Sequence, residues 1–253
     1  MAENFTHHDY IKNTKFLEEY NLYQKRYSKN MRDSDRVLTN FICNHVTKTE
    51  FKHEPTLLDI GCSTGNLLLH LKRLLPGIDM TGGDLAISSI KEAQNNPDLS
   101  GISFKEMDIF NLPNNKYDII IANAVGVYFK WRDYQYLLDS VYRSLKPGGA
   151  YFAFEWLHSF DHQDLIIYET TLSHPEGIRI CFRPIKKVSE YLNNVGYLKS
   201  EFIPFEIPFD MEEPPHDGEV VSYTKKLFDG KRLMFRGALD QPWCHMIAHK
   251  GYA

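Results

Sequence analysis

The sequence predicts an α/β fold in which a mostly parallel sheet is covered by helices on both faces. Short apolar runs recur through the middle of the chain, helical patterns separate them, and three of the runs carry an aspartate at their ends. The chain has 253 residues, of which 43% are hydrophobic, so it is long enough to bury one large core. We expect a single domain spanning residues 1–253.

The first 54 residues are expected to form a helical cap, or lid, of two helices between Asp9 and Glu50. Asp33-Ser34-Asp35 marks the start of the second helix, and apolar residues follow at helical spacing. Lid candidates in this region are Tyr20, Tyr23, Tyr27, Met31 and Arg32. In the alternative, the tyrosines only pack the two helices together and Arg32 is a solvated charge.

The stretch from Leu57 to Leu67 predicts a buried strand that ends on a carboxylate and turns through glycines into a helix. Glycine allows positive φ and close approach of a ligand, and a helix that begins near Gly65 offers free N–H groups to an anion. Asp59 would repel a pyrophosphate but would suit an ammonium group. The expected ligand therefore carries an ammonium group beside a carboxylate.

Two better-known glycine loops do not match. The dinucleotide fingerprint G-x-G-x-x-G fails because Ser63 occupies the middle position between Gly61 and Gly65. A phosphate-binding P-loop needs a lysine directly after the last glycine, and none follows until Lys72. An ordinary strand-to-helix turn remains the alternative for this segment alone.

The next strand, Ile78 to Thr81, is followed by Gly82-Gly83-Asp84. Asp84 lies 19 positions after Gly65 (84 − 65), close to the spacing of about 20 expected for an acid that binds a ribose diol. A carboxylate can accept hydrogen bonds from both hydroxyls. Asp84 could also, or instead, cap the helix that begins at Leu85.

Three further strands complete the alternation. Ile102 to Met107 is followed by Asp108-Ile109, Tyr117 to Ala124 is strongly apolar, and Leu145 to Gly149 ends a helix before a strand from Ala150 to Trp156. Beyond it we expect an insertion (161–182), a helix (186–194), a long strand (197–209), an exposed acidic, proline-rich loop or lid (211–219) and a final pair of strands (230–236 and 243–249).

Taken in order, the five segments between Thr56 and Trp156 resemble the class I S-adenosylmethionine-dependent methyltransferases that act on small molecules. The resemblance implies a Rossmann-like, seven-stranded sheet, mostly parallel with the last strand antiparallel. It also implies a cofactor-binding core at 55–157, an N-terminal helical cap, and substrate-facing insertions and final strands at 158–253. Ser63 departs from the pattern, since many members have glycine there.

The resemblance also implies the cofactor, S-adenosyl-L-methionine, with S-adenosyl-L-homocysteine as product. It assigns the methionine part to Asp59, Gly61, Cys62, Ser63 and Gly65, the ribose and adenine to Asp84, Leu85, Asp108 and Ile109, and the sulfur end to Asn123 and Ala124. Arg32 could meet the methionine carboxylate as a charged donor. The turn Leu145 to Gly149 is structural in the family.

Methyl transfer needs an in-line nucleophile, and a hydroxyl acceptor also needs a base. His158 follows the fifth strand and is the first candidate base, while Glu155 could orient it or replace it; His174 and His245 are weaker alternatives. Residues that could line an acceptor pocket are Tyr128, Trp131, Trp156, Arg179 and Arg183. Each of these also has a purely structural interpretation.

The predicted activity is methylation of a small molecule, with a hydroxyl of an activated or nucleotide-linked sugar as the preferred acceptor. The alternatives are an amine or a small carboxylic acid as acceptor, or a non-catalytic binding protein. A net charge of −4 argues against nucleic acid and membrane partners. Four scattered cysteines indicate reduced thiols, no metal site and a cytoplasmic location. The oligomeric state is left open.

Overall fold

The computed structural model describes residues 14–159, 165–169, 178–209, 222–226, 230, 232–236 and 242–252. The helices are α1 (Thr14–Lys25), α2 (Asp33–Lys48), α3 (Asn66–Leu74), α4 (Ile87–Gln94), α5 (Trp131–Ser144) and α6 (Ile185–Val195). Three short 3-10 turns are η2 (Pro97–Leu99), η3 (Ile109–Asn111) and η4 (Gly126–Tyr128). The strands are β1 (Thr56–Ile60), β2 (Asp79–Asp84), β3 (Ser103–Glu106), β4 (Tyr117–Asn123), β5 (Leu145–His158), β6 (Leu165–Glu169), β7 (Ile178–Pro184), β8 (Tyr197–Pro204), β9 (Ser222–Lys226), β10 (Arg232–Arg236) and β11 (Trp243–Lys250).

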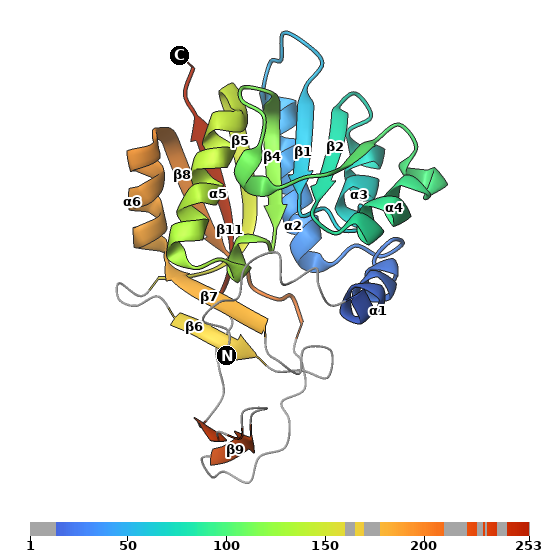
Figure 1. The fold of residues 1–253 in the computed structure, drawn as a ribbon. Helices are drawn as coiled ribbons and strands as arrows, with labels where there is room; N and C mark the ends of the chain where they lie inside the picture. The colour runs from blue at the N-terminus through green and yellow to red at the C-terminus, as the bar shows by residue number, and fades with distance from the viewer. Residues whose placement is uncertain are drawn as a thin grey trace.

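The central sheet has the strand order β3-β2-β1-β4-β5-β11-β8 (Figure 1). The pairs among β1 to β5 are all parallel, whereas β11 is antiparallel to both of its neighbours. This arrangement confirms the predicted α/β fold, a seven-stranded, mostly parallel sheet whose last strand is antiparallel. Because parallel strands end at one edge, the loops that follow β1, β2 and β4 lie together there.

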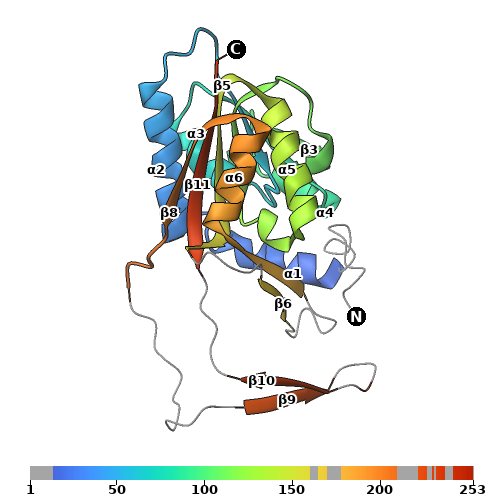
Figure 2. The same ribbon diagram turned by 90° about the vertical axis from the view of Figure 1, so that its left-hand side faces the viewer.

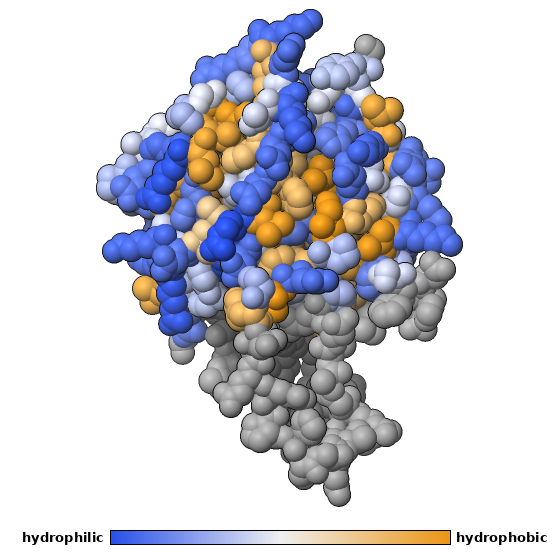
Figure 3. Space-filling view, turned by 180° about the vertical axis from the view of Figure 1, so that it is seen from behind, coloured by the Kyte–Doolittle hydropathy of each residue, from blue (hydrophilic) through white to orange (hydrophobic). Residues whose placement is uncertain are grey.

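Helices cover both faces of the sheet, as Figure 2 shows with α2 on one side and α5 and α6 on the other. The strand side chains alternate: Leu57 and Ile119 face the layer of α2 and α3, while Leu58 and Ile120 face the layer of α5 and α6. Seen from behind, bands of hydrophilic residues separate hydrophobic stretches on the surface (Figure 3). Among the described residues, no helix is long and apolar enough to cross a bilayer.

Several predicted boundaries were wrong. The strand β5 begins at Leu145, so the segment expected to be a turn is its first part, with Gly148 at φ 78°. Pro204 ends β8, which is shorter than predicted. The two expected final strands are present as β10 and β11. The strand β10 pairs with β9, which the sequence had not indicated, and β11 pairs with β5 and β8. Met211 to Glu219 lies outside the described residues, as does His174.

The segment expected as an insertion contains the strands β6 and β7, which pair antiparallel with each other. Only the end of β7 reaches the central sheet, where Leu157 pairs with Arg183 and His158 with Pro184 in a parallel register. The insertion is therefore attached to the carboxyl end of β5, next to the loops that follow β1 and β4.

A buried histidine on β11 faces α2. His245 is fully buried, its ring stacks on Phe154 at 4.5 Å, and Phe41 and Phe205 meet it edge-on at 5.5 and 5.8 Å. Neither ring nitrogen has a hydrogen-bond partner among the described residues. Burial lowers the pKa of His245 to about 4. His245 is therefore a core residue rather than a candidate base.

This burial predicts a pH-dependent loss of stability. A histidine with a lowered folded-state pKa stabilises the protein above its unfolded pKa of about 6.5, and that stability is lost as the pH falls toward 4. His245 alone should lower the free energy of unfolding by about 2 kcal/mol between pH 7 and pH 5. In urea unfolding, the variant His245→Phe should lose less stability than wild type over this interval. Equal losses would contradict the prediction.

Candidate cofactor and acceptor site

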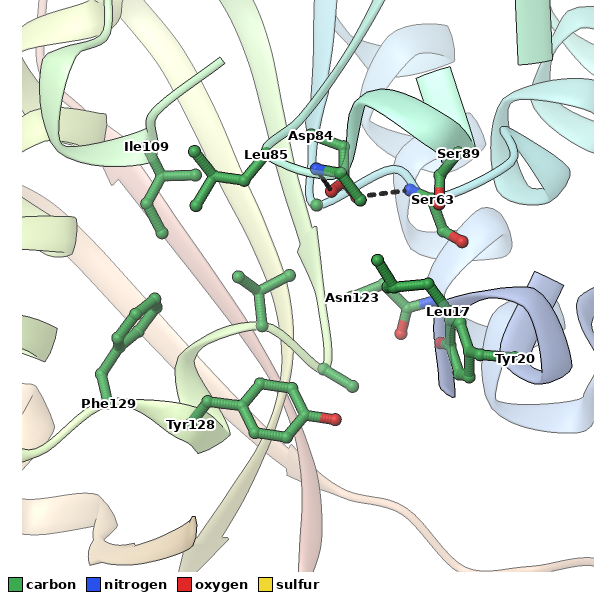
Figure 4. A pocket seen from close by; sticks show the side chains of 14 residues that line it. Leu17, Tyr20, Ser63, Asp84, Leu85, Ser89, Ile109, Asn123, Tyr128 and Phe129 are labelled. Atoms are coloured by element: carbon green, nitrogen blue, oxygen red, sulfur yellow. Dashed lines mark hydrogen bonds between the residues drawn. The ribbon is translucent and has the colours of Figure 1, made fainter. Parts of the chain in front are cut away.

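Two cavities adjoin at the carboxyl ends of β1, β2 and β4, with empty volumes of about 790 and 490 Å³. Both cavities are lined by Tyr20, Gly61, Ser63, Asn123 and Ala124. Only the larger is lined by Leu17, Asp84, Leu85, Ala86, Ser89, Ile109, Val125, Tyr128 and Phe129 (Figure 4). Only the smaller is lined by Gln24, Arg32, Asp35, Asp59, Cys62, Thr64, Asn66 and Leu67.

The loop between β1 and α3 forms the wall shared by the two cavities. Gly61, Ser63 and Gly65 all have positive φ, at 70°, 50° and 81°. Glycine adopts this conformation without strain, whereas Ser63 is held in it by a hydrogen bond from its backbone N to Asp84 at 2.8 Å. The N–H groups of Gly61 and Cys62 both donate to the carbonyl of Gly83. These hydrogen bonds fix the loop against β2 and allow Ser63 to keep a positive φ without being a glycine.

Asp84 ends β2 and lies in the larger cavity. Its carboxylate accepts hydrogen bonds from the backbone N of Ser63 and of Ala86, both at 2.8 Å. Burial raises its pKa, and these N–H donors oppose that shift. The helix α4 starts at Ile87 with Ala86 as its N-cap residue, so Asp84 is not the cap. A carboxylate has about four acceptor positions, which leaves capacity for two ligand hydroxyls.

Asp59 lies in the smaller cavity with an exposed fraction of 2%. Its Oδ1 has no hydrogen-bond partner among the described residues. Burial raises the pKa of Asp59 well above its usual value, and the nearby carboxylates of Asp84 and Asp35 add to the shift. A buried carboxylate oxygen without a donor is costly, so a cationic ligand group here would be stabilised.

Charges of both signs meet in the smaller cavity. The guanidinium of Arg32 lies 4.0 Å from Asp35, donates to Gln24 at 3.0 Å and sits over the ring of Tyr27 at 4.1 Å. Asp35 also accepts from the amide of Asn123 at 2.8 Å, which ties α2 to the end of β4. The cavity can therefore hold a ligand that carries both an ammonium group and a carboxylate.

The larger cavity has an apolar wall from Leu85, Ile109, Val125 and Phe129. Asp108 precedes Ile109 but is not among the residues that line either cavity. Its two oxygens accept from the backbone N of Phe110 and the side chain of Asn111, both at 3.0 Å. The structure thus shows a local, loop-stabilising contact for Asp108, and a role toward adenine stays a prediction.

The two residues expected to act as bases lie at the end of β5 but do not line the cavities. Glu155 is fully buried and accepts from the backbone N of Gly126 at 3.0 Å. Burial raises its pKa to about 8. His158 is 9% exposed, on the same strand. A role of either side chain as a base stays a prediction.

Of the five residues expected to contact an acceptor, only Tyr128 lines a cavity. Trp156 packs on Phe182 and Trp243, and Trp131 packs on Tyr134 and Tyr191. Arg179 and Arg183 are 1% exposed and donate to backbone carbonyls of the segment that contains Tyr128. The two arginines therefore contact the backbone beside Tyr128, and the two tryptophans pack on other aromatic rings. None of the four lines either cavity.

Several lining residues were not assigned to the site from the sequence. Val125 and Phe129 directly follow the Asn123-Ala124 pair, so their position after β4 was a usable signal. Leu17 and Gln24 belong to α1, Ser89 to α4 and Asp35 to α2. No local pattern indicates that these helices turn those residues toward the cavities. Tyr20 and Arg32, expected in the lid, do line the cavities.

The sheet order, the glycine loop and the strand-end aspartates together form an α/β domain with two adjoining cavities at one sheet edge. Residues 57–149 match a family model described as a methyltransferase domain. The match covers 93 of the 253 residues (149 − 57 + 1), from β1 to the first part of β5.

Two characterised proteins are similar to part of this chain. A malonyl-[acyl-carrier protein] O-methyltransferase from Priestia megaterium is 29% identical over 120 residues, 47% of this chain and 43% of that enzyme. A carboxy-S-adenosyl-L-methionine synthase from Campylobacter lari is 23% identical over 177 residues, 69% of this chain and 65% of that protein. The matches thus span less than two thirds of either relative.

A solved structure shares the fold over almost the whole chain. The 1,6-didemethyltoxoflavin-N1-methyltransferase of Burkholderia thailandensis, with bound 1,6-didemethyltoxoflavin and S-adenosylhomocysteine, has a TM-score of 0.58 at 14% identity and covers 99% of this chain and 93% of its own. At this identity the likeness concerns the fold.

Proposed function

We propose that this protein transfers a methyl group from S-adenosylmethionine to a small-molecule acceptor. The observation that carries the proposal is the pair of adjoining cavities, with Asp84 in one, Asp59 and Arg32 in the other, and the loop of Ser63 between them. A nucleoside joined to an amino acid has the matching distribution of hydroxyls, ammonium and carboxylate. Bound S-adenosylmethionine would supply a methyl group already activated on a sulfonium.

The chain's residues fit this cofactor from end to end. Asp84 would accept the ribose hydroxyls, and Leu85, Ile109 and Phe129 would pack on the adenine. Asp59, whose Oδ1 lacks a partner among the described residues, would accept from the ammonium group. Arg32 would donate to the carboxylate. Asn123 and Ala124, which border both cavities, would lie beside the sulfur.

The acceptor would enter between Tyr20 of α1 and Tyr128 of η4, which point into the larger cavity from opposite sides (Figure 4). Two aromatic rings can pack on a sugar face, which supports the activated-sugar hydroxyl expected from the sequence. Among the described lining residues there is no histidine, and this favours an acceptor that needs no base, such as an amine or a carboxylate. Oxygen and nitrogen acceptors both occur among the similar proteins, since one is named an O-methyltransferase and another an N1-methyltransferase.

The test is transfer of labelled methyl groups from S-adenosylmethionine into a metabolite extract, alongside calorimetry with S-adenosylhomocysteine. Binding together with a labelled small molecule as product would support the proposal. Binding without transfer would instead support a non-catalytic cofactor-binding protein, and absence of binding would refute both. Labelled RNA or protein in place of a small molecule would contradict the acceptor class. At saturating S-adenosylmethionine, a rate that rises with pH would favour a hydroxyl or an amine acceptor over a carboxylate.

A further inference from the structure

The segment Val125–Phe129, which we call the η4 wall, supplies Val125, Tyr128 and Phe129 to the larger cavity. Three buried side chains with ionisable groups, two arginines and one glutamate, hold its backbone from behind. The guanidinium of Arg179 donates twice to the carbonyl of Tyr128, at 3.1 Å from Nε and 2.8 Å from Nη2. Arg183 donates from Nη2 to the carbonyl of Phe129. Glu155 accepts from the backbone N of Gly126 at 3.0 Å.

Removing these ionisable groups from water costs free energy, and packing contacts alone would not offset that desolvation cost. Arg179 and Arg183 are each 1% exposed, and Glu155 is fully buried. Apolar side chains of similar size would fill the same space with less desolvation. The arginines offer what apolar residues lack, because a planar guanidinium can donate to carbonyl groups that face away from water.

The wall is also sterically confined on its inner side. A Cβ on Gly126 would come within 2.4 Å of Tyr134 and 2.6 Å of Glu155. The guanidinium of Arg183 lies 4.0 Å over the ring of Tyr134, next to the Glu155 carboxylate whose charge it favours. The η4 wall is therefore held at both ends of its turn, by β5 at Gly126 and by β7 at Tyr128 and Phe129.

The two arginines come from outside the cofactor-binding core. They lie on β7, which pairs with β6 over five residue pairs and with β5 over only two. The carboxylates of the two cavities come from α2, β1 and β2 instead, and the glycine loop lies between β1 and α3. No residue of β7 lines either cavity, and β7 contacts the η4 wall both through these arginine hydrogen bonds and through Ile180 and Phe182, which share an apolar cluster with Val127 and Tyr128.

We propose that Arg179 and Arg183 are positioning residues that set the place of Tyr128, and through it which acceptor fits the cavity. The inference rests on the proposed function and assigns the β6–β7 insertion a role in acceptor selection. Altering the arginines should move the η4 wall while the loop around Ser63, fixed to Gly83 and Asp84, stays in place.

The test uses Arg179→Met, which removes the donors but keeps an apolar stem, and Arg179→Lys, which restores a charge and a donor. Arg73→Met, on the exposed side of α3, is the matched control. Hydrogen exchange followed by mass spectrometry should show amides of 126–129 exchanging about tenfold faster in Arg179→Met, with amides of 61–70 unchanged. Arg179→Lys should recover part of the protection, and Arg73→Met should match wild type.

The second readout is methyl transfer into the metabolite extract. In Arg179→Met, incorporation should fall by about tenfold or the labelled products should change, while the Kd for S-adenosylhomocysteine stays within about threefold of wild type. Unchanged exchange at 126–129 would overturn the proposal, as would equal losses of cofactor affinity and transfer. Should Arg179→Met fold poorly, Arg183→Lys provides the same comparison. Failure of wild type to bind the cofactor would refute the proposed function, whereas the exchange result would still decide the positioning role.

Discussion

Replacing Asp84 with alanine should weaken binding of both S-adenosylhomocysteine and 5′-methylthioadenosine by about 100-fold. The two ligands share the adenosine, and the variant removes the carboxylate expected to accept its two ribose hydroxyls. Two hydrogen bonds to a charged group contribute about 3 kcal/mol together, which corresponds to about two orders of magnitude in Kd. Asp84→Asn keeps the shape and one acceptor oxygen, and should weaken both ligands by at least about tenfold.

The control for this experiment lies on the same strand. Asp79 is exposed at the opposite end of β2, so Asp79→Ala should leave both affinities unchanged. Thermal unfolding has to accompany the calorimetry, because Asp84 also accepts from the backbone N of Ser63 and Ala86. Wild-type affinity in a folded Asp84→Ala protein would remove the main support for the adenosine half of the site.

Replacing Asp59 with asparagine should separate the same two ligands. S-adenosylhomocysteine carries the ammonium group that Asp59 is expected to bind, so its affinity should fall by about 30-fold, equivalent to about 2 kcal/mol. 5′-Methylthioadenosine lacks the amino-acid part, so its affinity should stay within about twofold of wild type. Calorimetry with both ligands measures the difference directly.

The pKa of Asp59 allows a second test, the pH dependence of S-adenosylhomocysteine binding. Burial raises that pKa well above its usual value in the free protein, and a neutral carboxyl attracts an ammonium group less than a carboxylate does. The affinity for S-adenosylhomocysteine should therefore rise with pH in wild type, and this rise should be smaller in Asp59→Asn. If both ligands weaken equally, Asp59 supports the loop rather than the ammonium group.

The parts of the site that could be predicted are those determined by short segments of sequence. Gly61 and Gly65 mark a turn with positive φ, and Asp59 and Asp84 lie on strands whose order in the chain brings them to one sheet edge. Such features need only a local pattern and the rule that parallel strands end together. Asp84 lines the larger cavity and Asp59 the smaller one, although their binding roles stay predictions.

The residues that contact the acceptor could not be predicted from local sequence in the same way. Arg179 was expected to face a ligand, yet it faces the carbonyl of Tyr128, because the attachment of β7 to β5 decides which way its side chains point. That register depends on pairing across a long insertion, which leaves no signal in adjacent residues. For the same reason Asp35 was recognised as part of a helix start, while its contact with Asn123, 88 positions away, was not.

The position of β11 has a consequence for how the chain folds during synthesis. This strand lies between β5 and β8 and pairs with both, although it follows all other described strands in the sequence. Until it has left the ribosome, β5 exposes one edge and β8 has no neighbour in the central sheet. Unpaired strand edges are sites of aggregation. The sheet is therefore completed only after β11 has been synthesised, and a ribosome-stalled chain that stops before residue 243 should be cleaved by protease faster than one that includes 243–250.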